Sequence, residues 1–153
     1  MEQIDKKTLV KTARQHLENG FLQEALRIYQ DILAIDPEYS QALHDLGMIY
    51  FDAGNISEAI SLLKEATQRD DKRTDFHNNL GTVLKASGDL AAAEKAFRKA
   101  LTLDRNLVPA LVNIGSLLIE RGQIPAALKA LKRAIELAPE NSTALSSYAE
   151  ANK

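Results

Sequence analysis

Apolar residues recur along this chain with the spacing of amphipathic helices. Leu9, Ala13 and Leu17 are spaced to share one helical face, and a second apolar run with helical spacing follows Gly20. A glycine suits the position between two helices because a tight turn often needs a positive φ. Pro37 then ends the second run, since proline cannot continue a helix. The pattern predicts a pair of helices within residues 6–39.

This arrangement returns at a fixed offset of 34 residues. Gly81, Gly88 and Ala93 have counterparts 34 residues earlier, which are Gly47, Gly54 and Ala59, and 34 residues later, which are Gly115, Gly122 and Ala127. The offset predicts four helix pairs, at about 6–39, 40–73, 74–107 and 108–141, after a flexible lead-in at 1–5.

A tenth-length segment at about 142–151 reads as one more helix. Its Leu145 and Tyr148 are in register with Leu111 and Ile114, so we expect them to cover the end of the stack. A single helix pair cannot bury its apolar face alone, whereas stacked pairs share one continuous core. Residues 6–153 are therefore predicted to form a single domain. The junction at 69–73 is polar and has no proline, and we expect it to be looser than the others.

Several columns of the repeat resemble the tetratricopeptide repeat (TPR) family. The matching residues include the pairs Leu46-Gly47, Leu80-Gly81 and Ile114-Gly115, the second-helix alanines Ala25, Ala59, Ala93 and Ala127, and the closing prolines Pro37 and Pro139. A 34-residue period with this many matching columns is a strong signal. The first repeat departs from it, with Thr12-Ala13 where Leu-Gly is expected. The resemblance covers about residues 6–151.

The resemblance implies an all-α fold, a right-handed superhelical α-solenoid of antiparallel helix pairs. It also implies that the first helix of each pair lines a concave groove that binds a segment of a partner protein. The expected groove residues are Arg14, His44, Asp45, Met48, Phe51, Asn78, Asn79, Thr82, Lys85, Val112, Asn113, Ser116 and Ile119. The same spacing adds Lys7, Val10 and Lys11 in the first repeat.

Two features of this expected groove suggest how it binds. Asn79 and Asn113 occupy the same place in adjacent repeats, and an amide can both donate to and accept from a peptide backbone. This looks like the asparagine ladder of the repeats attached to O-linked N-acetylglucosamine transferases, although Asp45 at the third such place could only accept. The alternative is that both asparagines are solvated polar residues. Met48 and Phe51 would be hydrophobic anchors for a partner or, alternatively, core residues packed against the neighbouring repeat.

A more specific family site is not expected. The clamp for chaperone tails in some TPR proteins needs Lys and Asn on one first helix, Asn on the next, and Lys and Arg on the third. The first three repeats offer Val10, Arg14, Asp45, Asp75 and Asn79 instead. We predict no terminal-carboxylate clamp.

Catalytic and metal-binding chemistry is also not expected. The chain has no cysteine, which excludes a disulfide framework, a cysteine nucleophile and a cysteine-based zinc site. His16, His44 and His77 are far apart and form no HExxH motif, and His16 and His77 fall on core-facing columns. His44 and Asp45 are adjacent in sequence, so we expect them on different faces of the helix. The sequence predicts no enzyme, no metal and no cofactor.

Charge and hydropathy narrow the partners. The net charge is −2, and the four repeats carry 0, −2, +1 and +1, so no repeat shows the basic excess expected of a surface for nucleic acid or anionic membrane. No apolar run approaches the ~20 residues of a membrane span, and no secretory signal is visible. We expect a soluble cytoplasmic protein with no nucleic-acid partner and no membrane insertion.

The sequence therefore predicts a scaffold that binds an extended or helical segment of another protein in a concave groove. One alternative is a regulatory or substrate-presenting segment of a larger enzyme such as a glycosyltransferase. Another is a homo-oligomer that assembles through an imperfectly covered end.

Overall fold

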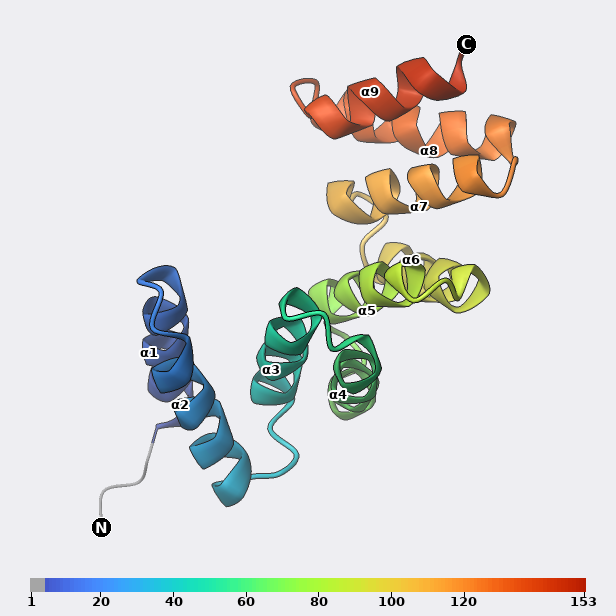
Figure 1. Cartoon of the computed structure of the whole chain (residues 1–153). Coiled ribbons are helices and arrows are strands. Elements are labelled where there is room, and N and C mark those ends of the chain that lie inside the picture. Colours follow the sequence, from blue (N-terminus) through green and yellow to red (C-terminus); the bar gives the residue numbers. More distant parts are fainter. Residues whose placement is uncertain (1–4) are drawn as a thin grey trace. The chain divides into compact units, whose positions relative to one another are not determined.

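The computed structural model describes residues 5–153, and this range consists of nine α-helices (Figure 1). Their bounds are α1 Lys6–Glu18, α2 Leu22–Ile35, α3 Ser40–Asp52, α4 Ile56–Arg69, α5 Thr74–Ala86, α6 Leu90–Leu103, α7 Val108–Glu120, α8 Ile124–Leu137 and α9 Ser142–Ala151. The all-α fold and the four helix pairs followed by one helix are confirmed. Of the predicted lead-in, only Asp5 lies within the described residues.

The turns inside the pairs adopt the conformation that their glycines predict. Gly20, Gly54 and Gly122 all have positive φ, and Gly88 has φ +88°. After Gly88, the Asp89 side chain accepts a hydrogen bond from the backbone N–H of Ala92 at 3.1 Å. Asp89 is the N-cap of α6, where such a bond satisfies one of the free amides of the first turn.

The glycines inside the first helices have a different role, which is to let the two helices of a pair approach closely. A Cβ added to Gly81 would lie 2.5 Å from Cε1 of Phe97, and one added to Gly115 would lie 2.6 Å from Cγ of Leu131. The first repeat has Ala13 in this column, opposite Tyr29, and both are fully buried. The absence of a side chain therefore sets the contact of the helices in the later repeats.

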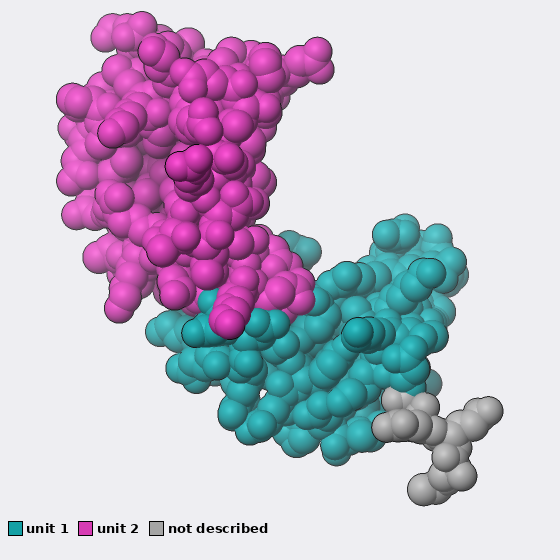
Figure 2. Space-filling view, turned by 180° about the vertical axis from the view of Figure 1, so that it is seen from behind, with its two compact units in different colours: residues 1–71 teal, residues 72–153 magenta. Residues whose placement is uncertain are grey.

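The chain divides into two compact units, one ending at Asp71 and the other spanning Lys72–Lys153 (Figure 2). The division falls in the polar junction that the sequence predicts to be loose. Because each unit has its own packed interior, each is described separately below. The single domain expected over 6–153 stays a prediction.

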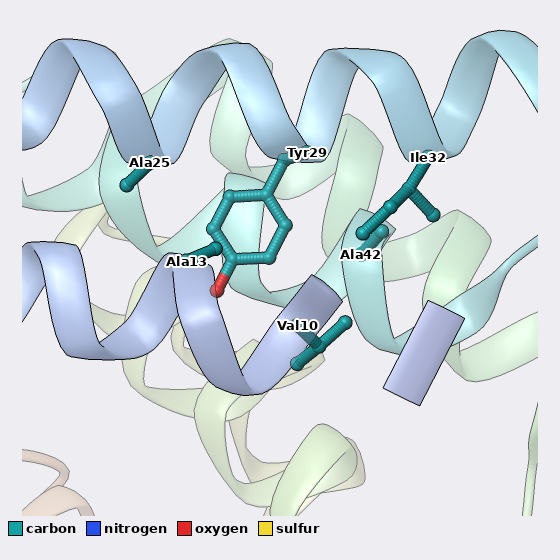
Figure 3. Close-up of a cluster of buried hydrophobic side chains, with 6 residues drawn as sticks. All are labelled: Val10, Ala13, Ala25, Tyr29, Ile32 and Ala42. Carbon is teal, nitrogen blue, oxygen red and sulfur yellow. The ribbon is translucent and has the colours of Figure 1, made fainter. Parts of the chain in front are cut away.

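Unit 1 contains α1 to α4, which pack in sequence, α1 on α2, α2 on α3 and α3 on α4. A cluster of buried apolar side chains joins its first three helices (Figure 3). Tyr29 and Ile32 of α2 are fully buried, and Ala42 of α3 reaches the same cluster. Tyr29 therefore fills the space between the first repeat and the second.

Unit 2 contains α5 to α9, in which α7, α8 and α9 pack on one another (Figure 1). Ala144 of α9 is fully buried in a cluster with Leu111, Val112 and Ala134. The expected contacts of α9 are corrected in one respect, because Leu145 is 44% exposed. The corresponding Leu111 is only 7% exposed because α8 covers it, and no second helix follows α9 within the described residues.

None of the helices in residues 5–153 is both long enough and apolar enough to cross a membrane.

Candidate functional site

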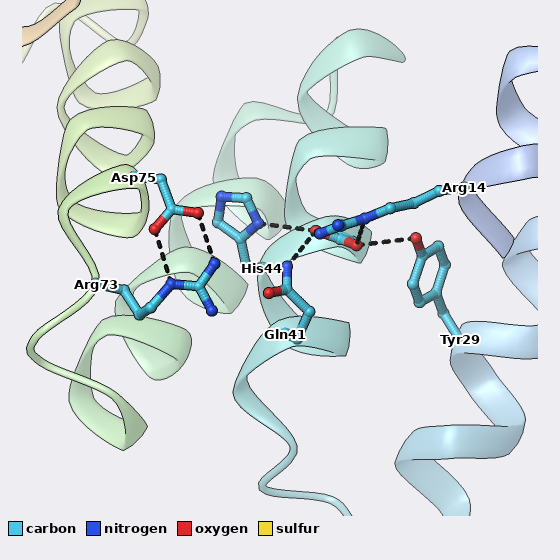
Figure 4. A network of polar contacts seen from close by, with 7 residues as sticks. Arg14, Tyr29, Gln41, His44, Arg73 and Asp75 are labelled. Carbon is cyan, nitrogen blue, oxygen red and sulfur yellow. Dashed lines mark hydrogen bonds and ion pairs between the residues drawn. The ribbon is translucent and has the colours of Figure 1, made fainter. Parts of the chain in front are cut away.

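In unit 1, the expected groove residue Asp45 lies at the centre of a polar network between α1, α2 and α3 (Figure 4). Its Oδ2 accepts hydrogen bonds from Nε of Arg14 at 2.8 Å and from the hydroxyl of Tyr29 at 3.0 Å. Its Oδ1 accepts from Nη2 of Arg14 at 3.0 Å and from Nε2 of Gln41 at 2.8 Å. Nδ1 of His44 is 2.9 Å from the same oxygen. The carboxylate is thus occupied by partners from its own unit.

The surroundings of Asp45 change its acidity. Burial alone would raise the pKa of this carboxyl group, but hydrogen bonds from His44 and Arg14 and the charge of Arg14 outweigh burial and lower the pKa to about 2. Burial, with the negative charge of Asp45 beside it, raises the pKa of the Tyr29 hydroxyl. Asp45 is therefore a carboxylate, and Tyr29 a neutral donor to it, throughout the physiological range.

This network corrects one expectation and limits another. His44 and Asp45 do not point to different faces of α3, because their side chains are in contact. Both residues are also buried, His44 at 6% exposure and Asp45 at 8%. An oxygen that already accepts from several donors has little capacity left for a partner, so Asp45 acts in this structure by holding Arg14.

The exposed side of α1 carries the cavity of unit 1. It has a volume of about 420 Å³ and is lined by Lys7, Val10, Lys11, Arg14, Gln15 and Glu18. Arg14 is exposed, and its bidentate contact with Asp45 fixes the plane of the guanidinium group. On α3, Met48 and Phe51 are half-buried, which leaves both interpretations of these two residues open.

In unit 2, side chains of α5 and α7 form a second polar row. Nδ2 of Asn113 donates to Oδ1 of Asn78 at 3.1 Å and lies 3.4 Å from Oγ1 of Thr82. One turn further along, Nζ of Lys85 donates to Oγ of Ser116 at 3.1 Å. Asn113 and Thr82 are half-buried, whereas Asn78 is 8% exposed. The row therefore lies partly open to solvent, with Asn78 beneath it.

Asn113 is asymmetric in this row. Both of its amide hydrogens are directed to α5, so it presents an acceptor, its Oδ1, rather than the donor and acceptor of a full ladder rung. Asn79 is half-buried and has interactions of its own. Of the two apolar residues expected in the groove here, Val112 is 7% exposed and belongs to the core, and Ile119 is half-buried.

The histidines and carboxylates form no metal site within the described range. No group of three or more His, Cys, Asp or Glu residues in residues 5–153 could hold an ion. His77 is 9% exposed, as its core-facing column predicts. His16 is half-buried and meets the ring of Phe21 edge-on, with ring centroids 6.0 Å apart.

Comparison with protein families agrees with this arrangement of helix pairs. Two tetratricopeptide-repeat families match the chain, one over residues 16–80 and one over residues 75–140. The chain belongs to the tetratricopeptide repeat family. No curated protein matches it in sequence.

Solved structures of other TPR proteins share the fold. The crystal structure of MamA matches at TM-score 0.83 and 24% identity, over 98% of this chain and 84% of that one. YrrB, described as a TPR protein with an unusual peptide-binding site, matches at TM-score 0.80 and 22% identity, over 96% and 76%. The first TPR of Spaghetti (RPAP3), bound to the HSP90 peptide SRMEEVD, matches at TM-score 0.73 and 23% identity, over 76% and 93%.

The polar contacts between neighbouring TPR first helices have a spacing that reasoning from single columns missed. Arg14 and Asp45, Thr82 and Asn113, and Lys85 and Ser116 are each 31 residues apart. This is one repeat less one helical turn, so each first helix contacts the next about a turn out of step. A search for complementary polar pairs at this offset would have found all three, but not Tyr29, which reaches Asp45 from a second helix.

Proposed function

We propose that this chain is a protein-interaction scaffold and binds a polypeptide segment of a partner on the surfaces of its first helices. In unit 1 the surface is formed by α1 and α3, and in unit 2 by α5 and α7. Membership of the TPR family supports the scaffold function. The likeness in fold to YrrB and to the first TPR of Spaghetti, whose descriptions name peptides, supports a peptide as the ligand.

The observation that carries the proposal is the orientation of Asn113. Its amide hydrogens are held by Asn78 and Thr82, so its carbonyl oxygen is fixed before any partner arrives. A fixed acceptor at a half-buried position suits a backbone N–H of an extended peptide, which it can bind without reading the peptide's side chains. Ser116 and Lys85 continue the row along the same helices.

The chemistry of unit 1 differs from that of unit 2. Lys7, Lys11 and Arg14 line its cavity with one acidic residue, Glu18, and Arg14 is held by Asp45. A peptide segment with acidic side chains complements such a surface better than a neutral one. The prediction that the chain lacks the terminal-carboxylate clamp is kept, because Val10 and Asp45 stand where the clamp needs polar and amide donors, and both are buried.

The test is a peptide selection followed by affinity measurement. Peptides selected from a displayed library on the full chain would be titrated by calorimetry against the wild type, Asn113→Ala and Thr102→Ala, an exposed α6 control whose hydroxyl bonds only to its own helix. Loss of one hydrogen bond of about 1 kcal/mol weakens binding about fivefold for Asn113→Ala. Circular dichroism would confirm that both variants stay folded. Equal affinity of the two variants would contradict this role of Asn113.

Self-association through α9 is a second candidate, favoured by one observation. The face that Leu111 and Ile114 bury against α8 at 7% and 3% exposure is only partly covered in α9, where Leu145 is 44% exposed and Tyr148 is half-buried. A second copy could cover this face. Light scattering at two concentrations would test it: the wild type should gain mass with concentration and Leu145→Ser should not, whereas a wild-type mass that stays monomeric would end the idea.

A further inference from the structure

The second helices of unit 2 carry an unusual set of charges. Together α6 and α8 contain six basic residues and two acidic ones, Glu94 and Glu136. The corresponding helices of unit 1, α2 and α4, contain three basic and four acidic residues. The repeat columns make the contrast sharper, because the six basic residues fill three columns in both helices. They pair as Lys95 with Lys129, Arg98 with Lys132, and Lys99 with Arg133.

All six basic side chains are exposed, and their spacing places them on one side of each helix. Residues at i, i+3 and i+4 lie on the same helical face, which is the spacing of Lys95, Arg98 and Lys99. The next residue on this face, four positions after Lys99, is Leu103, which is 37% exposed. In α8 the same place is held by Leu137, also 37% exposed. Each helix thus presents three cations followed by a leucine.

Two contacts show that the helices run side by side in the same direction. Arg121, just before α8, contacts Glu94 near the start of α6. Arg133, in the second half of α8, donates from Nη2 to Oδ1 of Asn106 at 2.8 Å, and Asn106 follows the end of α6. The starts of the two helices and their ends are therefore matched. We call the six basic residues with Leu103 and Leu137 the α6/α8 basic face.

The lysines of this face are not neutralised by the protein. Glu94 pairs with Arg98 at 2.7 Å, and Glu136 lies 3.5 Å from Arg133. Lys95, Lys99, Lys129 and Lys132 form no ion pair with any residue in 5–153. Lysine is a strongly hydrated point charge on a flexible chain, suited to a diffuse anionic surface more than to bidentate recognition.

We propose that the α6/α8 basic face binds the surface of a membrane that contains anionic phospholipids. Four lysines without acidic partners supply the attraction to the headgroups, and Leu103 and Leu137 supply apolar side chains that can enter the boundary with the acyl chains. This is attachment to a surface, and it needs no spanning helix. It is independent of the proposed peptide binding by the first helices.

A nucleic acid fits this face less well. Binding to single strands relies on aromatic side chains that stack on bases, and the aromatic residue of α6 and α8, Phe97, is fully buried. Exposed leucines contribute little on a phosphate backbone. The charge of each repeat, which is +1 for the last two, gave no sign of the face because first helices and turns dilute it. Folding separates these residues and gathers the cations of the second helices.

The experiment is co-sedimentation of the full chain with vesicles of three parts phosphatidylcholine to one part phosphatidylserine, and with vesicles of phosphatidylcholine alone. The test variant is Lys95→Gln/Lys99→Gln/Lys129→Gln/Lys132→Gln. Its matched control, Arg27→Gln/Lys64→Gln/Lys72→Gln/Lys153→Gln, removes the same charge from exposed positions elsewhere. A third variant replaces the four lysines of the test set by arginine and keeps the charge.

The wild type should bind only vesicles with phosphatidylserine, and less at high salt. Each lysine removed should lower the partition coefficient about fivefold, so the test variant should lose at least about a hundredfold. The charge-matched control and the arginine variant should bind much as the wild type does. Leu103→Ser/Leu137→Ser should bind several-fold more weakly, whereas Ile35→Ser, at a 57% exposed position of α2, should not.

Three results would overturn the proposal. One is binding that does not depend on phosphatidylserine, and another is an equal loss in the test variant and its charge-matched control. The third is tighter binding to a DNA duplex or to polyglutamate than to the vesicles, with no effect of the leucine substitutions. That last result would assign the face to a different polyanion.

Discussion

Replacing Gly81 by alanine tests whether the glycine column of the first helices is set by the neighbouring second helix. The new Cβ would lie 2.5 Å from Cε1, 2.6 Å from Cδ1 and 3.0 Å from Cζ of Phe97. Ordinary carbon contacts are about 3.5–4.0 Å, so the methyl group would overlap the face of the ring. Phe97 is fully buried, and a close-packed interior leaves such a ring little room to move.

Two opposing effects decide the magnitude. Alanine has a higher helix propensity than glycine, which favours the variant by about 1 kcal/mol in a helix interior. Overpacking a well-packed site costs about 1–3 kcal/mol, and a rigid ring is at the upper end because it cannot fold away as a leucine can. We therefore expect Gly81→Ala to lower the free energy of unfolding by about 1–2 kcal/mol.

The chain supplies its own control at Gly47, which holds the same column. There the new Cβ would lie 3.0 Å from Cγ and 3.3 Å from Cδ2 of Leu63, and 3.3 Å from Cβ of Leu62. A shift of a few tenths of an ångström in Leu63 relieves these contacts, so we expect Gly47→Ala to stay within about 1 kcal/mol of wild type. Urea unfolding followed by circular dichroism would compare the midpoints, since two units need not unfold in one step.

A double variant makes the reasoning refutable. In Gly81→Ala/Phe97→Leu the ring is absent, and the loss should be smaller than the sum of the two single losses by about 1 kcal/mol. If Gly81→Ala were as stable as wild type, or if the two substitutions added without coupling, the overlap with Phe97 would not be the reason for glycine at this position.

Two further predictions concern polar contacts. Asp45 has a pKa of about 2 against its ordinary 3.8, so its carboxylate stabilises the fold above pH 4 by about 2 kcal/mol, and this is lost as the pH falls from about 4 through about 2. The difference in unfolding free energy between wild type and Asp45→Asn should therefore shrink over that interval in acid titrations, and a constant difference would contradict the low pKa. Asp89→Ala should cost about 1 kcal/mol because it removes the N-cap bond of α6; Gln123→Ala, at the same turn position with no side-chain cap bond, should change the thermal midpoint little, and equal effects would refute the capping role.

Much of the fold was predictable because the repeat states each local rule several times. Gly88 and Asp89 fix a turn and a helix start through backbone conformation and one local hydrogen bond, and both are properties of neighbouring residues. The helix pairs follow from apolar spacing, which depends only on the helical period. Comparison of equivalent positions removed most of the ambiguity that one such pattern alone would carry.

The expected groove was predictable only in part, because exposure depends on which neighbour covers a helix. Val112 and Asn78 share a first-helix face with Asn113, yet adjacent helices bury the first two. Asp45 holds the same column as Asn113, but Tyr29 and Arg14 surround it because the first repeat places a tyrosine beside it. The column predicts the position of each residue on its helix but not the partners that reach it from other helices.

By itself, the sequence determined the helices, their turns, the period of the repeat and the family, since these depend on contacts within a few residues or on a pattern repeated at a fixed offset. The tertiary structure alone decided which polar side chains are held by neighbours, as Asp45 is, and which charges gather on one surface, as Lys95 and Lys129 do. Burial and electrostatic fields are sums over residues far apart in the chain. Packing brings those residues together, and no local pattern records the result.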